Sequence, residues 1–298
     1  MGEIRIAVIG DTHVGSNYAV FPEEFTNPES GNKIEANKWQ KELFKYWVKY
    51  AEKLSPVDIM ILIGDLVEGP QNKEKLGTLT LQNVQHQAMA FIELMKYWKW
   101  NKLYVIRGTE YHTEVPGVNV EEWIAQMLNA VPSSKWSEQR RSVKDLNLNV
   151  KFKQGKNMKT IKRIHFGHTV GVSIIPNYEF TPIVREAWLA KMYDELYGKY
   201  DIIVRGHLHR FRSAEISVDF LIYVNPCWQL PTPYQKKRSY FPYPDLGMTT
   251  LEIYLDGSHD LFKHVFRTIK PHDEEFIYEI QETEKYDEEG KDEVVIDV

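Results

Sequence analysis

Five short apolar runs in the sequence end in the same way, with a glycine followed by side chains that can bind a metal ion. These stretches are AVIGDTH (7–13), LIGDLVE (62–68), VIRGTEYH (105–112), IHFGH (164–168) and IVRGHLH (203–209). Carboxylate and imidazole groups are ordinary ligands of divalent transition metals. Because the pattern recurs five times, it predicts one metal site assembled from distant parts of the chain.

The candidate ligands in these stretches are two carboxylates and four imidazoles. They are Asp11, His13, Asp65, His168, His207 and His209. Taken alone, an aspartate after a glycine is more often a turn former, and a lone histidine is more often structural. Taken together, the six groups suffice for two divalent cations that share one carboxylate.

The elements that must position these groups are strands, because each apolar run has the length of a strand. The glycine after each run lets the backbone turn sharply, and sites in open α/β folds lie in loops at the carboxyl edge of the sheet. The expected strands cover residues 4–9, 58–63, 103–106, 148–153, 160–166 and 201–204, with further short strands near 214–224 and 249–267. The expected helices cover 35–54, 79–100, 119–130 and 182–197. This order predicts a central β-structure covered by helices.

The composition fits a globular protein, with 298 residues of which 43% are apolar and 27% are charged. No apolar run is long enough to span a bilayer, and the N-terminus lacks the pattern of a signal peptide. Cys227 is the single cysteine, which excludes an internal disulfide and indicates a reducing compartment. We therefore expect a cytoplasmic protein with no membrane partner.

The net charge of −5 hides an uneven distribution along the chain. Residues 272–298 carry twelve acidic side chains and two lysines, so the remaining body has a charge of about +5. We expect one domain over residues 1–271 and a solvated, partly disordered acidic tail over 272–298. The overall charge therefore does not exclude an anionic substrate.

Three of the stretches carry a resemblance to a known family. DTH at 11–13, GDLVE at 64–68 and GHLH at 206–209 resemble, in order and spacing, the motifs of the calcineurin-like metallophosphoesterases. The resemblance covers about residues 4–270 and implies a four-layer α/β/β/α sandwich with a dinuclear metal site. It implies that Asp11, His13 and His209 hold the first metal and that Asp65 bridges. His168 and His207 would hold the second metal.

The third motif departs from the family pattern GN-H-[DE]. Here the chain reads GTEYH, with Thr109 in the asparagine position and Glu110 in the histidine position. Either Thr109 or Glu110 supplies the missing oxygen ligand and His112 serves as the catalytic imidazole, or the second metal binds weakly. The stretches DTHVGS, GDLVEG, GTEYHTE and NPCWQLPTPY resemble a divergent branch of phage and archaeal genomes in which GT-x-x-H replaces GNH. That resemblance favours the first alternative.

The resemblance implies a metal-dependent phosphoesterase that hydrolyses phosphate monoesters or diesters. Two divalent cations would lower the pKa of a bridging water, and the resulting hydroxide would attack phosphorus in line. An imidazole can protonate the leaving oxygen, and we assign this role to His112. Manganese is the usual cofactor assumed for this family, while the mixed donors also suit zinc, iron or nickel. The alternative is a non-catalytic protein of the same fold that acts as a partner-binding scaffold.

Basic residues suggest how an anionic substrate would be held. Arg107 and Arg205 each precede a motif glycine, where a guanidinium can bind a substrate phosphate or instead tie loops together through carboxylates. The expected hairpin at 151–163 has six basic residues and no acidic one, and KKR at 236–238 adds three more. Such a surface favours either contact with a nucleic-acid backbone, which would make the enzyme a nuclease, or protection of an exposed sheet edge.

Overall fold

The computed structural model describes most of the chain in detail. The described residues are 3–70, 76–115, 118–132, 139–154, 157–173, 178–217, 219–233 and 243–267. The chain divides into a compact unit, Met1–Thr268, and a second unit, Ile269–Val298, which lies outside the described residues. The boundary expected at residue 271 and the acidic tail at 272–298 therefore stay predictions. The basic stretch 236–238 and residues 155–156 of the basic hairpin also lie outside the described residues.

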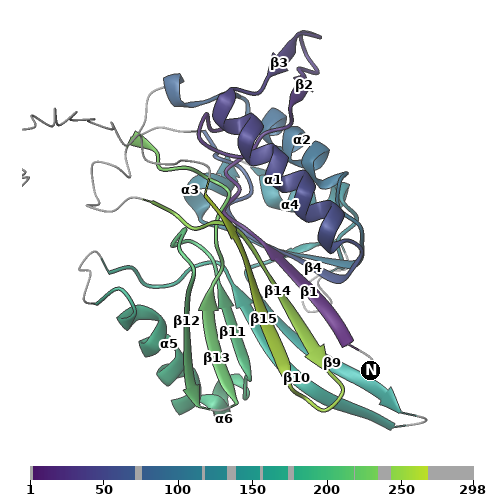
Figure 1. The fold of residues 1–298 in the computed structure, drawn as a ribbon, viewed down its shortest axis with the longest axis vertical. Helices are drawn as coiled ribbons and strands as arrows, with labels where there is room; N and C mark the ends of the chain where they lie inside the picture. Colours follow the sequence, from purple (N-terminus) through teal and green to yellow (C-terminus); the bar gives the residue numbers. More distant parts are fainter. Residues whose placement is uncertain are drawn as a thin grey trace, which may run out of the picture. The chain divides into compact units, whose positions relative to one another are not determined.

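The first sheet has six strands in the order β15-β14-β1-β4-β5-β8 (Figure 1). The strands are β1 Glu3–Ile9, β4 Val57–Ile63, β5 Trp100–Ile106, β8 Ser142–Val143, β14 Leu246–Tyr254 and β15 His259–Phe266. Strands β1, β4, β5 and β8 run parallel, while β14 and β15 add two antiparallel strands at one edge. The carboxyl ends of β1, β4 and β5 therefore meet at one edge of this sheet.

The second sheet has five strands in the order β12-β13-β11-β10-β9. The strands are β9 Asp145–Gln154, β10 Asn157–Gly167, β11 Ile202–Arg205, β12 Arg212–Ser217 and β13 Phe220–Val224. Strands β10, β11 and β13 are parallel, and β9 and β12 form the antiparallel edges. The expected basic hairpin is thus the pair β9 and β10, and β9 is an edge strand.

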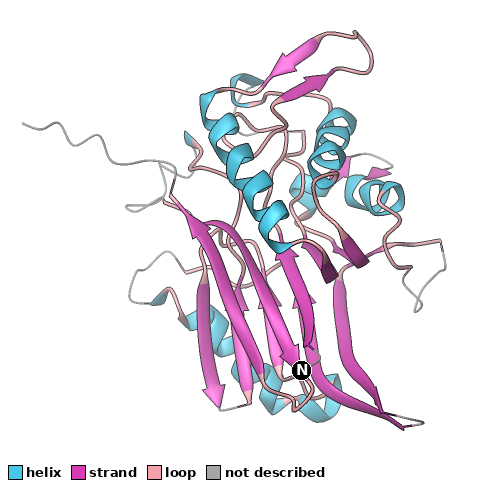
Figure 2. Ribbon diagram, turned by 45° about the vertical axis from the view of Figure 1, so that its right-hand side comes forward, coloured by secondary structure: helices cyan, strands magenta, loops and turns pink. Residues whose placement is uncertain are grey.

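The helices flank the two sheets (Figure 2). They are α1 Lys38–Leu54, α2 Val84–Met95, α3 Glu110–Thr113, α4 Val120–Met127, α5 Thr181–Met192 and α6 Asp194–Tyr197, with a 3-10 turn at Leu76–Thr78. Short strand pairs complete the described part: β2 Glu24–Thr26 with β3 Lys33–Glu35, and β6 Glu114–Val115 with β7 Val118–Asn119. In α1, Trp47 is buried and its Nε1 donates to the carbonyl of Leu94 in α2 over 2.9 Å, which ties the two helices together.

The main apolar core lies between the two sheets. It joins Ile6 of β1 and Ile61 of β4 to Phe166 of β10 and Val204 of β11. The alternate residues of β4, such as Leu62, are also fully buried, so this strand is covered on both faces as its apolar run predicts. A second core places α5 on the other face of the second sheet, against β11 and β13. The central β-structure covered by helices that the sequence predicts is confirmed.

Several boundaries differ from those expected. The helix expected over 79–100 is α2 at Val84–Met95, because the Asn83 side chain accepts from the Gln85 N–H and fixes the first turn there. Strand β5 begins soon after the helix, at Trp100, which pairs with Val57. The helix expected over 182–197 is interrupted at Tyr193, which separates α5 from α6. In both cases the apolar pattern continues past the point where the backbone leaves the helix.

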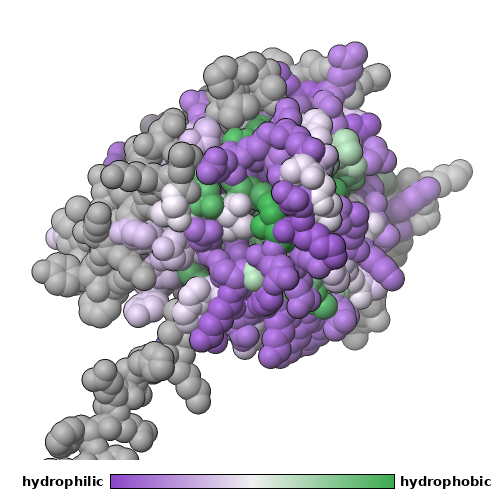
Figure 3. All heavy atoms as spheres, turned by 90° about the horizontal axis from the view of Figure 1, so that it is seen from above, coloured by the Kyte–Doolittle hydropathy of each residue, from purple (hydrophilic) through white to green (hydrophobic). Residues whose placement is uncertain are grey.

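One face of the molecule carries few contiguous apolar areas (Figure 3). Figure 3 shows one face as mainly hydrophilic, with small hydrophobic areas between polar side chains. Scattered apolar side chains of this kind are normal on a water-exposed surface. Among the described helices, none is long and apolar enough to cross a membrane.

Candidate metal centre

Six side chains predicted from the sequence converge where β1, β4, β10 and β11 end. Asp11, His13 and His209 form one group, and Asp65, His168 and His207 form another. Within each group the possible ligand atoms lie within 4.8 Å of one another. Two parallel strand pairs, one in each sheet, thus bring their carboxyl ends together at a single site.

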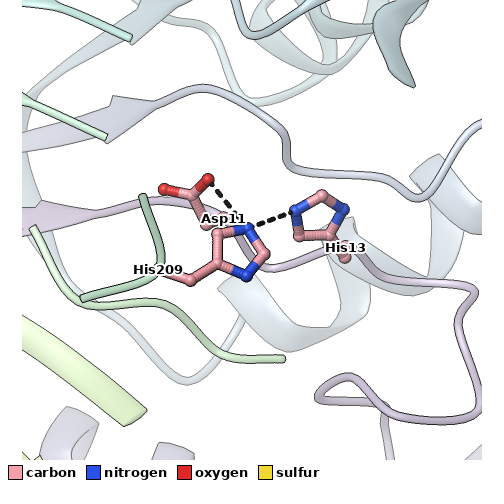
Figure 4. Close-up of side chains that lie close together, drawn as sticks. All are labelled: Asp11, His13 and His209. Atoms are coloured by element: carbon pink, nitrogen blue, oxygen red, sulfur yellow. Dashed lines mark hydrogen bonds and ion pairs between the residues drawn. The ribbon is translucent and has the colours of Figure 1, made fainter. Parts of the chain in front are cut away.

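The first group is centred on His209 (Figure 4). Its Nε2 lies 3.0 Å from Nε2 of His13 and 3.3 Å from Oδ1 of Asp11. Asp11 is fully buried, and its carboxylate also accepts from the backbone N–H of His207 over 3.0 and 3.1 Å. This carboxylate therefore contacts both histidines of the GHLH stretch.

The second group is centred on Asp65, which is also buried. Its Oδ2 lies 3.0 Å from Nε2 of His168. The same nitrogen lies 3.9 Å from Oδ1 of Asp11, which links the second group to the first. Asp65 is also grouped with His13 and His112, whose ligand atoms lie within 4.8 Å of one another. Both carboxylates therefore have neighbours in the two groups, and Asp65 is the one that is also grouped with His13 and His112.

The backbone at the site is held in a conformation that most residues avoid. Asp11, His13, Asp65, His207 and His209 have φ values between +44° and +74°. The left-handed backbone conformation costs a residue other than glycine about 1–3 kcal/mol of conformational free energy. Residues in this conformation are concentrated at functional sites. Of the six candidate ligands, only His168 is outside this set. Of the described residues, Asn129 is the one other non-glycine with positive φ, so the strain is concentrated at this cluster.

The glycines before these residues are needed for close approach more than for turning. At Gly206, an added Cβ would lie 2.9 Å from both Oδ2 of Asp11 and Nδ1 of His168. Of the five motif glycines, Gly64 is the one with positive φ, at +88°, and its added Cβ would lie 2.7 Å from Nδ1 of His168. Positive φ thus occurs at one of the five motif glycines, while Asp11, Asp65 and His207, which directly follow motif glycines, adopt positive φ themselves.

Three histidines are oriented through Nδ1, which leaves Nε2 for the site. Nδ1 of His168 donates to the Ile63 carbonyl over 2.7 Å, and Nδ1 of His112 donates to the Glu68 carbonyl over 2.6 Å. Nδ1 of His13 lies 2.9 Å from Oε2 of Glu68, an ion-pair distance without the alignment of a hydrogen bond. Such outer contacts fix the ring and the tautomer of metal-binding histidines.

Glu68 was not among the residues predicted for the site, although it closes the GDLVE stretch. It is 5% exposed, and its Oε2 accepts from Nε2 of Gln229 over 2.7 Å. Its side chain faces His13 while its carbonyl holds His112. The signal in the sequence that could have indicated Glu68 is an acidic side chain three residues after Asp65.

The third motif places Thr109 and Glu110 differently. The Thr109 N–H donates to Oδ1 of Asp65 over 2.7 Å, and its hydroxyl lies 3.0 and 3.2 Å from the two carboxylate oxygens. Glu110 begins α3 and is exposed. His112 follows in the same helix, with its ring 4.6 Å from that of His13. The structure therefore brings Thr109 and His112 to the site and leaves Glu110 outside it.

Glu121 is a second residue that the sequence reading missed. It is fully buried at the start of α4 and accepts from the Leu66 N–H over 3.0 Å and from the Gly108 N–H over 2.6 Å. Burial and the nearby Asp65 raise the pKa of Glu121 to about 7. One carboxyl thus joins the loop that carries Asp65 to the loop that carries Thr109.

The two arginines are held by carboxylates of neighbouring helices. Nε of Arg107 donates to the Ser142 hydroxyl over 2.8 Å, and its guanidinium lies 3.7 Å from Glu122. Nε of Arg205 donates to Glu186 over 2.6 Å, and the guanidinium also contacts His165. These contacts favour the alternative in which the arginines tie elements together, and we do not retain them as phosphate ligands.

The charges at the site depend strongly on one another. Burial alone would raise the pKa of Asp65, yet His168 beside it holds that pKa well below its usual range. Burial would lower the pKa of His168, but Asp65 and Asp11 raise it above its usual range. The two carboxylates therefore favour a positive charge at the position of His168.

The donor atoms fit divalent cations. Two nitrogen ligands about 2.0–2.1 Å from one ion lie roughly 3.3 Å apart in tetrahedral geometry. The 3.0 Å between the Nε2 atoms of His13 and His209 is within a few tenths of an ångström of that spacing, and so is the 3.0 Å between Nε2 of His168 and Oδ2 of Asp65. Two imidazole nitrogens at this distance are placed to bind the same cation.

Solved structures similar to the chain belong to several organisms. A zinc complex of Vps29 from Entamoeba histolytica shares 16% identity and covers 89% of this chain and 100% of its own, with a TM-score of 0.40. A predicted phosphoesterase from Streptococcus pneumoniae shares 12% identity, covers 85% of each chain and has a TM-score of 0.35. Purple acid phosphatase PPD1 from yellow lupin shares 14% identity and covers 89% of this chain but 53% of its own, with a TM-score of 0.46. We infer no function from these likenesses.

A family profile gives the clearer result. Among curated proteins, no sequence matches this chain. The profile of the calcineurin-like phosphoesterases matches residues 4–211, a span that contains all six candidate ligands and covers well over half of the chain. The chain therefore belongs to the calcineurin-like phosphoesterase family.

Proposed function

We propose that this protein is a metal-dependent phosphoesterase that binds two divalent cations and hydrolyses phosphate monoesters or diesters. The observation that carries the proposal is the meeting of six nitrogen and oxygen donors in two adjoining groups, five of them on left-handed backbone. Strain of that kind persists only where the surrounding structure enforces it. A scaffold that merely binds a partner has no need for these donors.

The residues of the chain take distinct parts in this proposal. Asp11, His13 and His209 would hold one cation, His168 and His207 the other, and Asp65 would contact both. Bound divalent cations neutralise phosphate oxygens and lower the pKa of a coordinated water. Thr109 steadies Asp65 through its N–H and hydroxyl, and we take its hydroxyl as the oxygen that replaces the motif asparagine. Manganese remains our first expectation for the metal.

His112 is proposed as the imidazole that moves a proton. Its Nδ1 donates to the Glu68 carbonyl, which leaves Nε2 as the atom that can take up a proton, and the residue is grouped with His13 and Asp65. Burial and the neighbouring His13 lower the pKa of His112. The ring therefore rests neutral and must first accept a proton before it can protonate a leaving oxygen.

Hydrolysis of bis-p-nitrophenyl phosphate with Mn²⁺ or Zn²⁺ tests the proposal. We expect turnover by the wild-type chain, and we expect Asp65→Ala to lose it because both cations depend on that carboxylate. Unchanged activity in Asp65→Ala, or no activity with any divalent metal, would reject hydrolysis and favour the scaffold alternative. Adding single-stranded DNA as a second substrate tests whether the enzyme is a nuclease. The cytoplasmic location stays a prediction.

A further inference from the structure

Two adjoining cavities lie on the α5 side of the second sheet, where the phosphoesterase proposal assigns no role. The first has a volume of about 370 Å³ and lies between α5 and strands β10 and β11. That volume falls within the roughly 300–1,000 Å³ of small-molecule sites. Leu189, Ala190 and Ile203 give it apolar walls, and Tyr193 and Tyr200 add two aromatic rings. Such walls suit a flat ring.

The same cavity contains one hydrogen-bond donor and one acceptor held in place by Arg205. Nη1 of Arg205 lies 2.9 Å from Nδ1 of His165, and because a guanidinium can only donate, Nδ1 accepts and the proton sits on Nε2. Burial and Arg205 lower the pKa of His165 to about 4, which keeps this neutral form at pH 7. Arg205 donates to Oε1 of Glu186, which leaves Oε2 as an acceptor among the described residues. The cavity lining thus offers a donor from His165 and an acceptor from Glu186, the two kinds of group that bind the edge of a nucleobase.

The second cavity adjoins the first at Tyr200 and is basic. It has a volume of about 480 Å³ and is lined by Lys151, Arg163 and Lys199, with no acidic side chain among its lining residues. Asn147 and Asn149 of β9 supply neutral polar groups beside these cations. Lysine and arginine close together at a surface cavity are the groups that bind phosphate.

The strand register joins the two cavities into one surface. Arg163 and His165 are two residues apart on β10, so their side chains lie on the same face of the sheet. They pair with Asn149 and Asn147 of β9 in the ladder. The Tyr200 ring packs against the His165 ring at 5.0 Å and lines both cavities. An apolar, aromatic pocket thus leads directly to a cluster of three cations.

We propose that these two cavities bind a nucleoside phosphate, with the base in the pocket of His165, Tyr193 and Tyr200 and the phosphate over Arg163 and Lys199. The ligand is either a free nucleotide or one nucleotide of a single strand, since both present the same base and phosphate. None of the proposed metal ligands lines either cavity. Binding there is therefore independent of hydrolysis at the metal centre.

Calorimetric titration of the full chain with AMP tests this site. Asp65→Ala in EDTA is the background, so that binding at the metal centre does not contribute. We expect one AMP to bind per chain. Adenosine, which lacks the phosphate, and inorganic phosphate, which lacks the nucleoside, should each bind at least about tenfold more weakly than AMP. Lys199→Glu should weaken AMP binding at least about tenfold, the effect of one lost charge-assisted contact. Tyr193→Ala, at a ring that is 44% exposed, should weaken it without unfolding the chain.

Lys102→Glu is the matched control, because Lys102 is an exposed lysine on β5 of the other sheet. We expect it to change AMP affinity less than about twofold. No saturable binding of either AMP or a short single strand, phosphate binding as tight as AMP binding, or equal effects of Lys102→Glu and Lys199→Glu would overturn the proposal. The basic residues would then serve to protect the edge strand.

A six-nucleotide single strand of deoxyadenosine distinguishes the two sources of the ligand. If the strand binds more tightly than AMP and Lys151→Glu weakens the strand alone, the site holds a nucleotide of nucleic acid. If AMP binds more tightly, the site holds a free nucleotide. Either result upholds nucleotide recognition, while binding of neither rejects it.

Discussion

Thr109 illustrates how one side chain can take over part of a missing motif. Its hydroxyl reaches both carboxylate oxygens of Asp65, while its N–H makes a separate bond that any residue would keep. We predict that Thr109→Val lowers metal affinity about tenfold, the usual effect of losing an outer contact to a ligand. Titration of the metal-free chain with Mn²⁺ measures this change.

Glu110→Ala is the control for that variant, because Glu110 is exposed at the start of α3. We expect its metal affinity to equal that of the wild type. If Glu110→Ala loses affinity and Thr109→Val does not, Glu110 supplies the missing oxygen and our choice of Thr109 is wrong.

Replacing His112 tests whether its imidazole transfers a proton or binds a metal ion. Because its Nδ1 is held by the Glu68 carbonyl, the ring is positioned without help from a metal. We predict that His112→Ala lowers kcat about 100-fold or more while metal content stays the same. Parallel measurement of turnover and bound metal decides the point, since an equal fall in both would make His112 a ligand.

At the scale of elements, Glu121 joins two loops that come from different strands. Its two oxygens accept from Leu66, next to Asp65, and from Gly108, next to Thr109. In Glu121→Gln one buried N–H loses its acceptor, which costs about 1–3 kcal/mol. We predict lower stability together with weaker metal binding, measured by urea unfolding and Mn²⁺ titration.

Glu122→Gln serves as the comparison for Glu121→Gln. Glu122 accepts from Arg141 and Ser142 and lies 3.7 Å from the Arg107 guanidinium, whereas the loop N–H groups of Leu66 and Gly108 are bound by Glu121. We expect this variant to lose stability but keep its metal affinity. If both variants weaken metal binding equally, Glu121 has no specific part in positioning the loops.

The elements also explain which features could be predicted from the sequence. The six donors follow directly after apolar strands, so their meeting at one edge follows from the pattern. Glu121 could not be found this way, because it lies in the first turn of a helix and 55 residues from its partner Leu66. The choice between Thr109 and Glu110 depended on where α3 begins, which the letters GTEYH do not reveal. The positive φ of the donors likewise depends on packing between loops.

At the scale of the whole molecule, the half-buried His165 makes stability depend on pH. Burial and Arg205 lower its pKa from 6.5 to about 4. The fold therefore favours the neutral ring, and this stabilisation is present above pH 6.5 and lost as the pH falls toward 4. At about 1.4 kcal/mol per pKa unit, the upper limit of the effect is about 3 kcal/mol.

His165→Gln isolates this effect, because glutamine keeps an acceptor for Arg205 and does not titrate. We predict that the wild type loses more stability than the variant between pH 7 and pH 4 in urea unfolding with EDTA. Equal losses in the two chains would show that His165 takes up its proton without cost to the fold.

The central claim is that Asp65 is shared by two divalent cations. Equilibrium dialysis of the purified chain against Mn²⁺ counts the bound ions directly. We predict two Mn²⁺ per wild-type chain and the loss of at least one in Asp65→Ala, because this carboxylate has donors of both groups around it. One ion or none in the wild type, or two retained by Asp65→Ala, would contradict the claim.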